Sequence, residues 1–265
     1  MVKTLSADER YRAVAYPYPA PEADCVWVDG RVEPLVGAGV NDIAAALESV
    51  GADPRARRTP ILAIGSNRAP SQLIRKFAGF PAPCAVLVAK AALKDFDVVF
   101  GASISGYGAV GGATLAPSPG TVVEVWATWL DDAQLAHMHE TEGLSAGVYA
   151  LLELQQIDLT FAAGPVWTAA EAYVQRAGAL NLGGAPTAFA DVPATGRKFQ
   201  ALTQRQAQAA LRDRFAQNRT VDQFIAENIH HKEKRMARVH TLRQSAIPFE
   251  WPHMHDVTPK SLWRG

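Results

Sequence analysis

The middle of the chain shows short apolar runs and apolar–polar alternation that are typical of β-strands. Two short helical patterns interrupt these runs. One carries Leu73, Ile74 and Phe77, and the other begins at Asp131, where Gln134 completes a capping box. Many strands with few helices predict an α+β domain or a small barrel, and not a doubly wound parallel sheet. The expected strands are 61–64, 85–89, 97–100, 122–129, 148–154 and 172–175.

Residues 1–54 show the signals of a small hairpin and short helices. Ser6 begins a capping box ahead of a first helix. The pair Asp29-Gly30 favours a tight turn between two short strands. Asn41 is expected to cap a further helix.

Residues 176–265 become helical after a loop-like stretch. Capping boxes begin at Thr203 and at Thr220, and the second is expected to open one long helix. The apolar residues that indicate this helix are Ile225, Ile229, Met236 and Val239. We therefore expect three regions: an N-terminal extension with a small hairpin and helix over 1–54, a barrel domain over 55–175 and a helical C-terminal region over 176–265.

Composition narrows the class of protein. The chain has 265 residues, of which 48% are hydrophobic, with 26 basic and 26 acidic side chains. This balance argues against a disordered chain and against a dedicated nucleic-acid binder. The charges are unevenly placed: no Lys or Arg occurs between Asp95 and Gln175, whereas from Arg197 onward 13 Lys and Arg residues face 6 Asp and Glu residues. An acidic centre docked on a basic tail and two separately solvated faces both fit this pattern.

The cysteines, the apolar runs and the histidines indicate the cellular compartment and whether a membrane span or a metal site is expected. Cys25 and Cys84 are too few for a cysteine metal site, so we expect free thiols in a reducing cytoplasm. The chain begins without a secretory apolar run, and no stretch approaches the roughly 20 apolar residues of a membrane-spanning helix. No two of the seven histidines have the spacing of a helical metal site, so no metal is expected.

The segment Ile61-Leu-Ala-Ile-Gly-Ser-Asn67 runs from a predicted strand directly into a helix. Gly65 allows a ligand to approach the backbone closely. The N–H groups of Gly65, Ser66 and Asn67 would then converge beside the positive N-terminus of the helix, which suits a carboxylate or a developing oxyanion. The alternative is an ordinary turn in which Ser66 or Asn67 only caps the helix.

A carboxylate ends the helix that begins at Asp131. Leu135, Met138 and Glu142 are three and four residues apart, so they share one helical face and Glu142 is expected to point toward the interior. Gly143 suits the left-handed cap that follows. Desolvation and the helix dipole both disfavour a charged carboxylate here, which suits a general base for an ammonium proton. The alternative is a frayed helix end with Glu142 in solvent.

Taken in order, three segments resemble the γ-glutamylcyclotransferase-like family over roughly residues 60–175. They are the loop Ile64-Gly-Ser-Asn67, the glycine-rich run 108–114 with a proline turn at 116–120, and Glu142-Gly143 followed by Tyr149. The glycine-rich run does not fit a dinucleotide fingerprint, because extended, proline-rich chain follows it instead of a helix.

The resemblance implies a small mixed β-barrel with packed helices and a pocket between the loop and the glutamate. It implies that Glu142 is the general base, that Gly65, Ser66 and Asn67 grip the substrate through backbone N–H groups, and that Tyr149 lines the pocket. The implied reaction is an intramolecular aminolysis that releases 5-oxoproline and an amine from a small γ-glutamyl compound. It needs no metal or organic cofactor, and neither a nucleic-acid nor a membrane partner is expected.

One departure from the family pattern keeps alternatives open. The family has a tyrosine before Gly-Ser-Asn, where this chain has Ile64. This change and the long flanks fit two further hypotheses: other amide or carbamoyl chemistry in the same pocket, or a non-catalytic binding or assembly protein on this fold.

Overall fold

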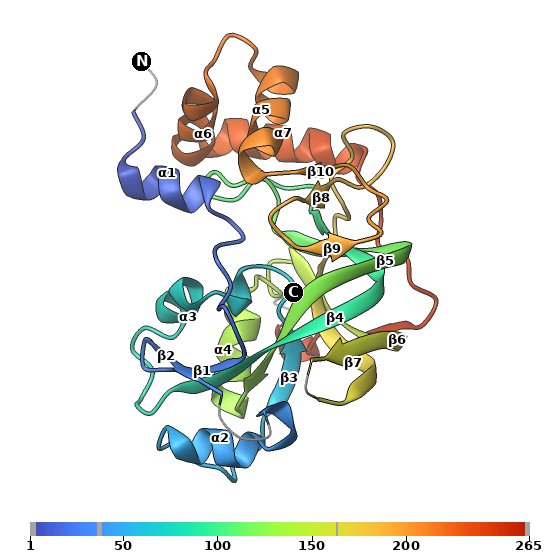
Figure 1. Cartoon of the computed structure of the whole chain (residues 1–265). Coiled ribbons are helices and arrows are strands. Elements are labelled where there is room, and N and C mark those ends of the chain that lie inside the picture. The colour runs from blue at the N-terminus through green and yellow to red at the C-terminus, as the bar shows by residue number, and fades with distance from the viewer. Residues whose placement is uncertain (1–3, 36–38, 163, 263–265) are drawn as a thin grey trace.

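The computed structural model of the chain describes residues 4–35, 39–162 and 164–262. Five strands form its centre: β3 (Thr59–Leu62), β4 (Ala85–Phe100), β5 (Ala113–Leu130), β6 (Tyr149–Phe161) and β7 (Val166–Gln175). They pair in the order β4–β5–β3–β7–β6, and β6 pairs again with β4, so the sheet closes into a barrel (Figure 1). Only β3 and β7 are parallel among these pairs. The α+β class with a small mixed barrel is therefore confirmed.

Strand β4 joins two strands that the sequence pattern had separated. The expected strands 85–89 and 97–100 are parts of one strand of 16 residues. The polar residues between them form a bulge, where Asp95 has a φ of 63° and the register with β5 shifts. A bulge bends a strand without ending its pairing, so the polar interruption did not mark a loop.

The expected proline turn at 116–120 is also wrong. Pro117 lies within β5, where it pairs with Phe96 of β4. Gly120 follows at a φ of 83°, and its N–H donates to Asp95 Oδ1 at 2.7 Å. The two kinks therefore face each other across one continuous ribbon, which curls as the barrel requires.

Two apolar clusters hold the barrel and its helices together. The first fills the barrel with residues such as Leu93, Leu115, Leu154 and Val174. The second joins the strands to α3 (Pro70–Lys76) and α4 (Asp132–Thr141), and it includes Trp27, Phe77, Trp126 and Met138. Because both helices pack into this second cluster, their C-terminal ends lie close together beside the barrel.

The N-terminal hairpin extends the sheet of the barrel. Strands β1 (Cys25–Val28) and β2 (Arg31–Pro34) form the expected antiparallel hairpin, and β1 also pairs with β4. Helix α2 (Ile43–Ser49) follows, but its N-cap is Asp42 and not Asn41. The Asp42 side chain accepts the N–H of Ala45 at 3.0 Å. Asp42 directly precedes the first helical residue, so its side chain reaches the N–H of the third one, as an N-cap does.

Helix α1 (Ala7–Val14) belongs spatially to the C-terminal helices. Its capping box at Ser6 is confirmed. Leu5 and Ala13 share a buried cluster with Ile225 of α6 (Val221–His230). The chain then runs from this helical group down to the hairpin on the barrel (Figure 1). Residues 14–24 therefore connect both ends of the molecule.

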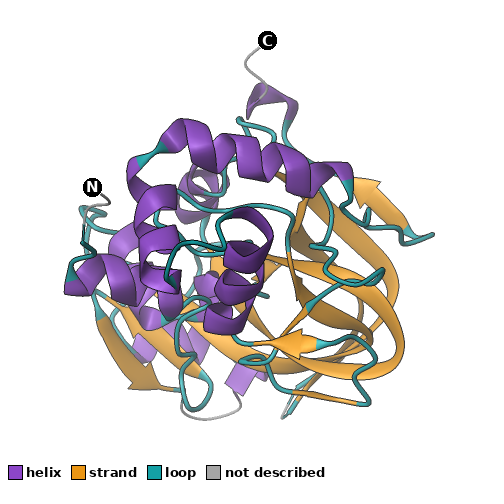
Figure 2. Cartoon of the chain, turned by 90° about the horizontal axis from the view of Figure 1, so that it is seen from above, coloured by secondary structure: helices purple, strands orange, loops and turns teal. Residues whose placement is uncertain are grey.

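The C-terminal region holds α5 (Gln204–Phe215), α6 and α7 (Lys232–Gln244), and both expected capping boxes are present. The prediction of one long helix is wrong, because His231 leaves the helical conformation at φ −123° and ψ 82°. This break lets Lys234 and Arg238 fold back onto Glu227. Figure 2 shows the helices gathered on one side of the molecule and the strands on the other.

Short strands and ion pairs attach this region to the barrel. Arg197 Nε lies 2.9 Å from Oδ2 of the fully buried Asp97, so the basic tail does dock on the acidic centre at this point. Other basic side chains pair within their own region, as Arg205 does with Asp222. None of the helices in the described ranges has the length and apolar character to cross a membrane. The short strands are β8 (Ala188–Phe189), β9 (Ala194–Thr195), β10 (Ala201–Leu202) and β11 (Met254–Asp256).

Candidate active site

Close packing around Gly65 shapes the loop that follows β3. A Cβ atom at this position would lie 2.8 Å from Tyr16 Oη and 2.9 Å from Ala113 Cβ, which is too close for either contact. The Tyr16 hydroxyl also accepts the Ala113 N–H at 2.7 Å. Only glycine therefore allows the loop to lie against this tyrosine from the N-terminal extension.

The loop itself is one short 3-10 turn, η2 (Ser66–Arg68), before α3. The N-cap of α3 is Ala69, which has no side-chain cap, so neither Ser66 nor Asn67 serves as the helix cap. Within the described ranges, the N–H groups of Gly65 and Ser66 donate to no other group. Unpaired N–H groups next to a glycine can donate to a bound anion.

Glu142 lies at the end of α4 and faces this loop. The helix begins with the predicted capping box of Asp131 and Gln134 and ends at Glu142, with Gly143 at a φ of 68° behind it. The Glu142 side chain is 15% exposed. Asn67 Nδ2 donates to Glu142 Oε1 at 3.2 Å. The fold thus joins the loop and the helix end, and Glu142 is not a frayed end in solvent.

Lys76 completes this contact and was not anticipated from the sequence. It ends α3, its side chain is 6% exposed, and its ammonium group forms an ion pair with Glu142 Oε1. The same ammonium group donates to Thr141 Oγ1 at 3.0 Å. The sequence had indicated only burial and the helix C-terminus beside Glu142. The Lys76 ammonium group adds a positive charge in direct contact with this carboxylate. A basic residue in a last helical turn is common, so no pattern marked this one.

The tyrosines near Glu142 stay protonated. Burial, and after it the negative charge of Glu142, raise the pKa of Tyr149 well above its ordinary range. Burial is also the largest cause that raises the pKa of Tyr16 and of Tyr107, and the charge of Glu142 adds to both shifts. Protonated phenols donate hydrogen bonds, so these hydroxyls suit an anionic group held beside Glu142.

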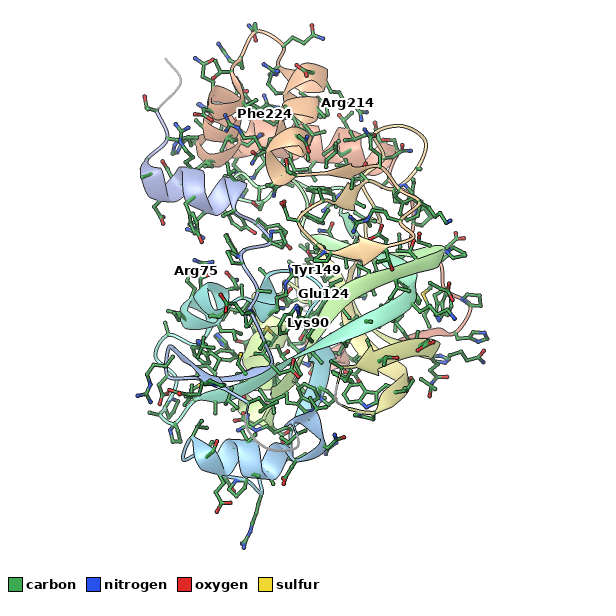
Figure 3. The ribbon with its side chains drawn as sticks, viewed as in Figure 1. Arg75, Lys90, Glu124, Tyr149, Arg214 and Phe224 are labelled. Carbon is green, nitrogen blue, oxygen red and sulfur yellow. The ribbon has the colours of Figure 1, made fainter. Side chains whose placement is uncertain are left out.

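Gly101 and Gly112 provide room for two polar side chains, Gln175 and Tyr149. Gln175 Nε2 donates to Tyr149 Oη at 3.1 Å, and Figure 3 marks Tyr149 at the centre of the molecule. A Cβ atom on Gly112 would lie 1.8 Å from Tyr149 Oη, and one on Gly101 would lie 2.2 Å from the Gln175 amide carbon. Any side chain at Gly101 or Gly112 would therefore collide with Gln175 or Tyr149. Nothing in the sequence spacing pointed to Gln175 or to Tyr16, because each meets the site only through tertiary packing.

The histidines of α4 do not contact Glu142. His139 Nδ1 lies 2.8 Å from Tyr173 Oη, and burial lowers the pKa of His139. His137 Nε2 lies 2.6 Å from the carbonyl oxygen of Lys76. Across residues 4–35, 39–162 and 164–262, no group of three or more His, Cys, Asp or Glu side chains is placed to hold a metal ion. Cys25 and Cys84 are free and buried.

Comparison with known proteins adds little to this geometry. No protein-family model matches the chain, and no curated protein matches it. Among solved structures, one titled "Gamma-glutamyl cyclotransferase" is similar at 15% sequence identity and a TM-score of 0.36, over 78% of this chain and 96% of that chain. With this TM-score and identity, the match says nothing of the reaction or the substrate.

Proposed function

We propose that the chain is an enzyme of the γ-glutamylcyclotransferase type, which cleaves a small γ-glutamyl compound by intramolecular aminolysis. The observation that carries this proposal is the way in which the two oxygens of the Glu142 carboxylate are paired. Asn67 and Lys76 both hold Oε1, whereas Oε2 has no hydrogen-bond partner in the described ranges. A positioned, partly buried carboxylate with one free oxygen suits proton transfer to and from a bound substrate.

In the proposed reaction, the α-amine of the γ-glutamyl group attacks its own γ-carbonyl carbon. A new C–N bond closes the five-membered ring, and the bond from that carbon to the leaving nitrogen breaks. Glu142 accepts the proton lost by the attacking nitrogen and returns it to the leaving amine. Because the nucleophile is tethered to the carbonyl, the protein mainly has to hold the cyclic conformation.

The loop and the tyrosines have complementary parts in this proposal. The free N–H groups of Gly65 and Ser66 donate to a carboxylate or to the oxygen that gains charge. Asn67 positions Glu142 through its side chain, and Tyr149 lines the binding space. The Tyr16 hydroxyl beside Gly65 supplies a phenol at the loop although residue 64 is isoleucine.

The ion pair with Lys76 favours a second candidate. A buried ammonium group that pairs with Glu142 fixes the end of α3 to the end of α4, which is also what a purely structural contact does. In that case the chain is a binding or assembly protein, and Glu142 contributes to its stability instead of its chemistry.

The deciding experiment measures 5-oxoproline released from a mixed pool of γ-glutamyl amino acids and amines. Glu142→Gln keeps the shape and the contact with Asn67 but removes the base, so turnover is expected to fall about 10²–10⁴-fold. The matched control is Glu140→Gln, because Glu140 lies on the same helix and is exposed. Release of ammonia or carbon dioxide without 5-oxoproline would replace the proposed reaction with other amide chemistry. No turnover by the folded wild type would favour the second candidate.

A further inference from the structure

A cavity lies beside the loop, at Arg68, and is not lined by Glu142, Asn67 or Tyr149. It has a volume of about 440 Å³, which is in the size range of small-molecule sites. Its walls come from residues 14, 15 and 17–20 of the N-terminal segment, from Arg68 at the end of η2, from Glu124 on β5, and from Asp191 and Pro193.

Arg68 is the unusual member of this lining. It is 3% exposed, and its Nη1 makes one long hydrogen bond, of 3.3 Å, to the carbonyl oxygen of Ile64. Its Nε is buried and has no hydrogen-bond partner in the ranges that the structure describes. Burial lowers the pKa of Arg68, which is the direction expected for a cation that has lost solvation. A buried, underpaired guanidinium group is costly unless an anion completes its hydrogen bonds.

The charge of Glu124 favours the charged form of Arg68, but the oxygens of Glu124 are engaged by other groups. Glu124 Oε2 forms an ion pair with Lys90 Nζ at 3.1 Å, and its Oε1 accepts the indole N–H of Trp126 at 3.4 Å. Figure 3 shows Lys90 and Glu124 at the middle of the molecule. Glu124 therefore acts on both Lys90 and Arg68, and within the described ranges it makes no hydrogen bond to Arg68. The guanidinium of Arg68 therefore keeps its capacity to bind a carboxylate in the paired geometry that arginine prefers.

The rim of the cavity carries the opposite charge. Asp191 is exposed and forms no ion pair within the described ranges. A simple anion that reaches Arg68 would also meet Asp191 and Glu124, whereas a ligand with an ammonium group would be attracted to them. Pro17, Tyr18 and Pro193 supply an apolar wall between these charges. The cavity is therefore complementary to a molecule with a carboxylate, a nearby ammonium group and an apolar side chain.

We propose that this cavity binds a free α-amino acid, with its carboxylate on the buried guanidinium of Arg68 and its ammonium group on Asp191 at the rim. This site is separate from the Glu142 site, and the proposal does not depend on any catalytic activity. It explains why an arginine without sufficient partners is kept buried next to the loop.

The test is an NMR titration of the full chain with L-leucine, following the Nε–H signal of Arg68 and the surrounding amides. The matched probes are 4-methylpentanoate, which lacks the amine, and 3-methylbutylamine, which lacks the carboxylate. L-Leucine is expected to shift the Arg68 Nε–H signal and to bind more tightly than either probe. Equal binding of L-leucine and 4-methylpentanoate would overturn the zwitterion assignment, and no shift with any of them at millimolar concentration would overturn the site.

Two variants identify the contacts. Arg68→Lys keeps the charge but loses the fork of donors, so affinity for L-leucine is expected to fall about tenfold. Arg55→Lys, in an exposed linker, is the control and should bind as the wild type does. Asp191→Asn changes an exposed side chain and leaves folding unaffected, so it tests the rim directly. It should lower the affinity for L-leucine several-fold without lowering the affinity for 4-methylpentanoate. Unchanged L-leucine affinity in both variants would overturn the proposal.

Discussion

Two buried glutamates in this chain have cationic partners, yet they are held in different ways. Glu227 is 5% exposed, and both of its oxygens are engaged, Oε1 by Lys234 and Oε2 by Arg238. Glu142 is 15% exposed, and Lys76 and Asn67 both contact Oε1 only. Both oxygens of the first carboxylate are paired, whereas one oxygen of the second has no partner among the residues that the structure describes.

This difference separates a structural role from a chemical one. A fully paired buried carboxylate fixes the geometry of the elements that carry its partners, here α6 and α7 across the break at His231. A carboxylate with a free oxygen can still exchange a proton with a ligand. The number of engaged oxygens, more than burial or the presence of a salt bridge, is therefore what marks Glu142 as the candidate base.

The strongest way to break this comparison is to make the same substitution at both sites. Glu227→Gln leaves Arg238 buried without its anion, and the free energy of unfolding is expected to fall by about 3 kcal/mol. Any 5-oxoproline release should persist at temperatures where the variant is folded. Urea unfolding followed by circular dichroism measures the loss. The exposed Glu233→Gln on α7 is the control and should change stability by less than about 0.5 kcal/mol. Equal losses of unfolding free energy in Glu227→Gln and Glu233→Gln would show that the ion pairs of Glu227 do not stabilise the fold.

A second test moves Tyr149 without touching Glu142. In Gly112→Ala the new Cβ would lie 1.8 Å from Tyr149 Oη, so the phenol must shift away. Turnover is expected to fall by roughly 10²-fold, because misplacement of about 1 Å has effects of that order. Gly183→Ala is the control, since a Cβ there meets no atom within 4 Å. Turnover that is unchanged by Gly112→Ala would mean that Tyr149 does not take part.

A third test measures how much the N-terminal extension stabilises the fold through the Tyr16 hydroxyl, which lies beside the Gly65 loop. Tyr16→Phe removes the acceptor of the buried Ala113 N–H, which is expected to cost about 1–3 kcal/mol of unfolding free energy. Tyr11→Phe is the control, since Tyr11 is 47% exposed. Both are measured by urea unfolding. A loss below that of Tyr11→Phe would show that the loop does not depend on this hydroxyl.

The smallest effect concerns pH. Burial alone would raise the pKa of Glu227, but the hydrogen bonds and charges of Lys234 and Arg238 outweigh it and lower the pKa below its ordinary value of 4.5. A lowered folded-state pKa gives stability that is present above pH 4.5 and is lost as the pH falls through the folded value. The wild type should therefore lose unfolding free energy as the pH falls below 4.5, and Glu227→Gln should show a shallower slope. Parallel slopes would contradict this assignment.

The capping and hairpin signals in the sequence were accurate, because neighbouring residues decide these conformations. The capping boxes at Ser6, Asp131, Thr203 and Thr220 are all present, because each is a contact between residues three positions apart. The hairpin at Asp29-Gly30 follows for the same reason. The bounds of β4 were wrong because cross-strand pairing carries the strand through a polar bulge. The prediction of one long C-terminal helix was wrong because the chain breaks at His231, and ion pairs of Glu227 with Lys234 and Arg238 stabilise the broken arrangement.

By itself, the sequence determined the α+β class, the four capping boxes, the Gly-Ser-Asn loop and the position of Glu142 on the inward face of its helix. Only the tertiary structure decided what meets Glu142. Asn67 and Lys76 contact Glu142 from the loop and α3, and the charge of Glu142 raises the pKa of Tyr16 and Tyr149, which come from two other segments. Arg68, buried and underpaired, lines a cavity with the N-terminal segment. Periodicity reports which face of an element is buried, but contacts between distant elements depend on how their apolar faces pack together. The charges and free oxygens of a site arise from those contacts.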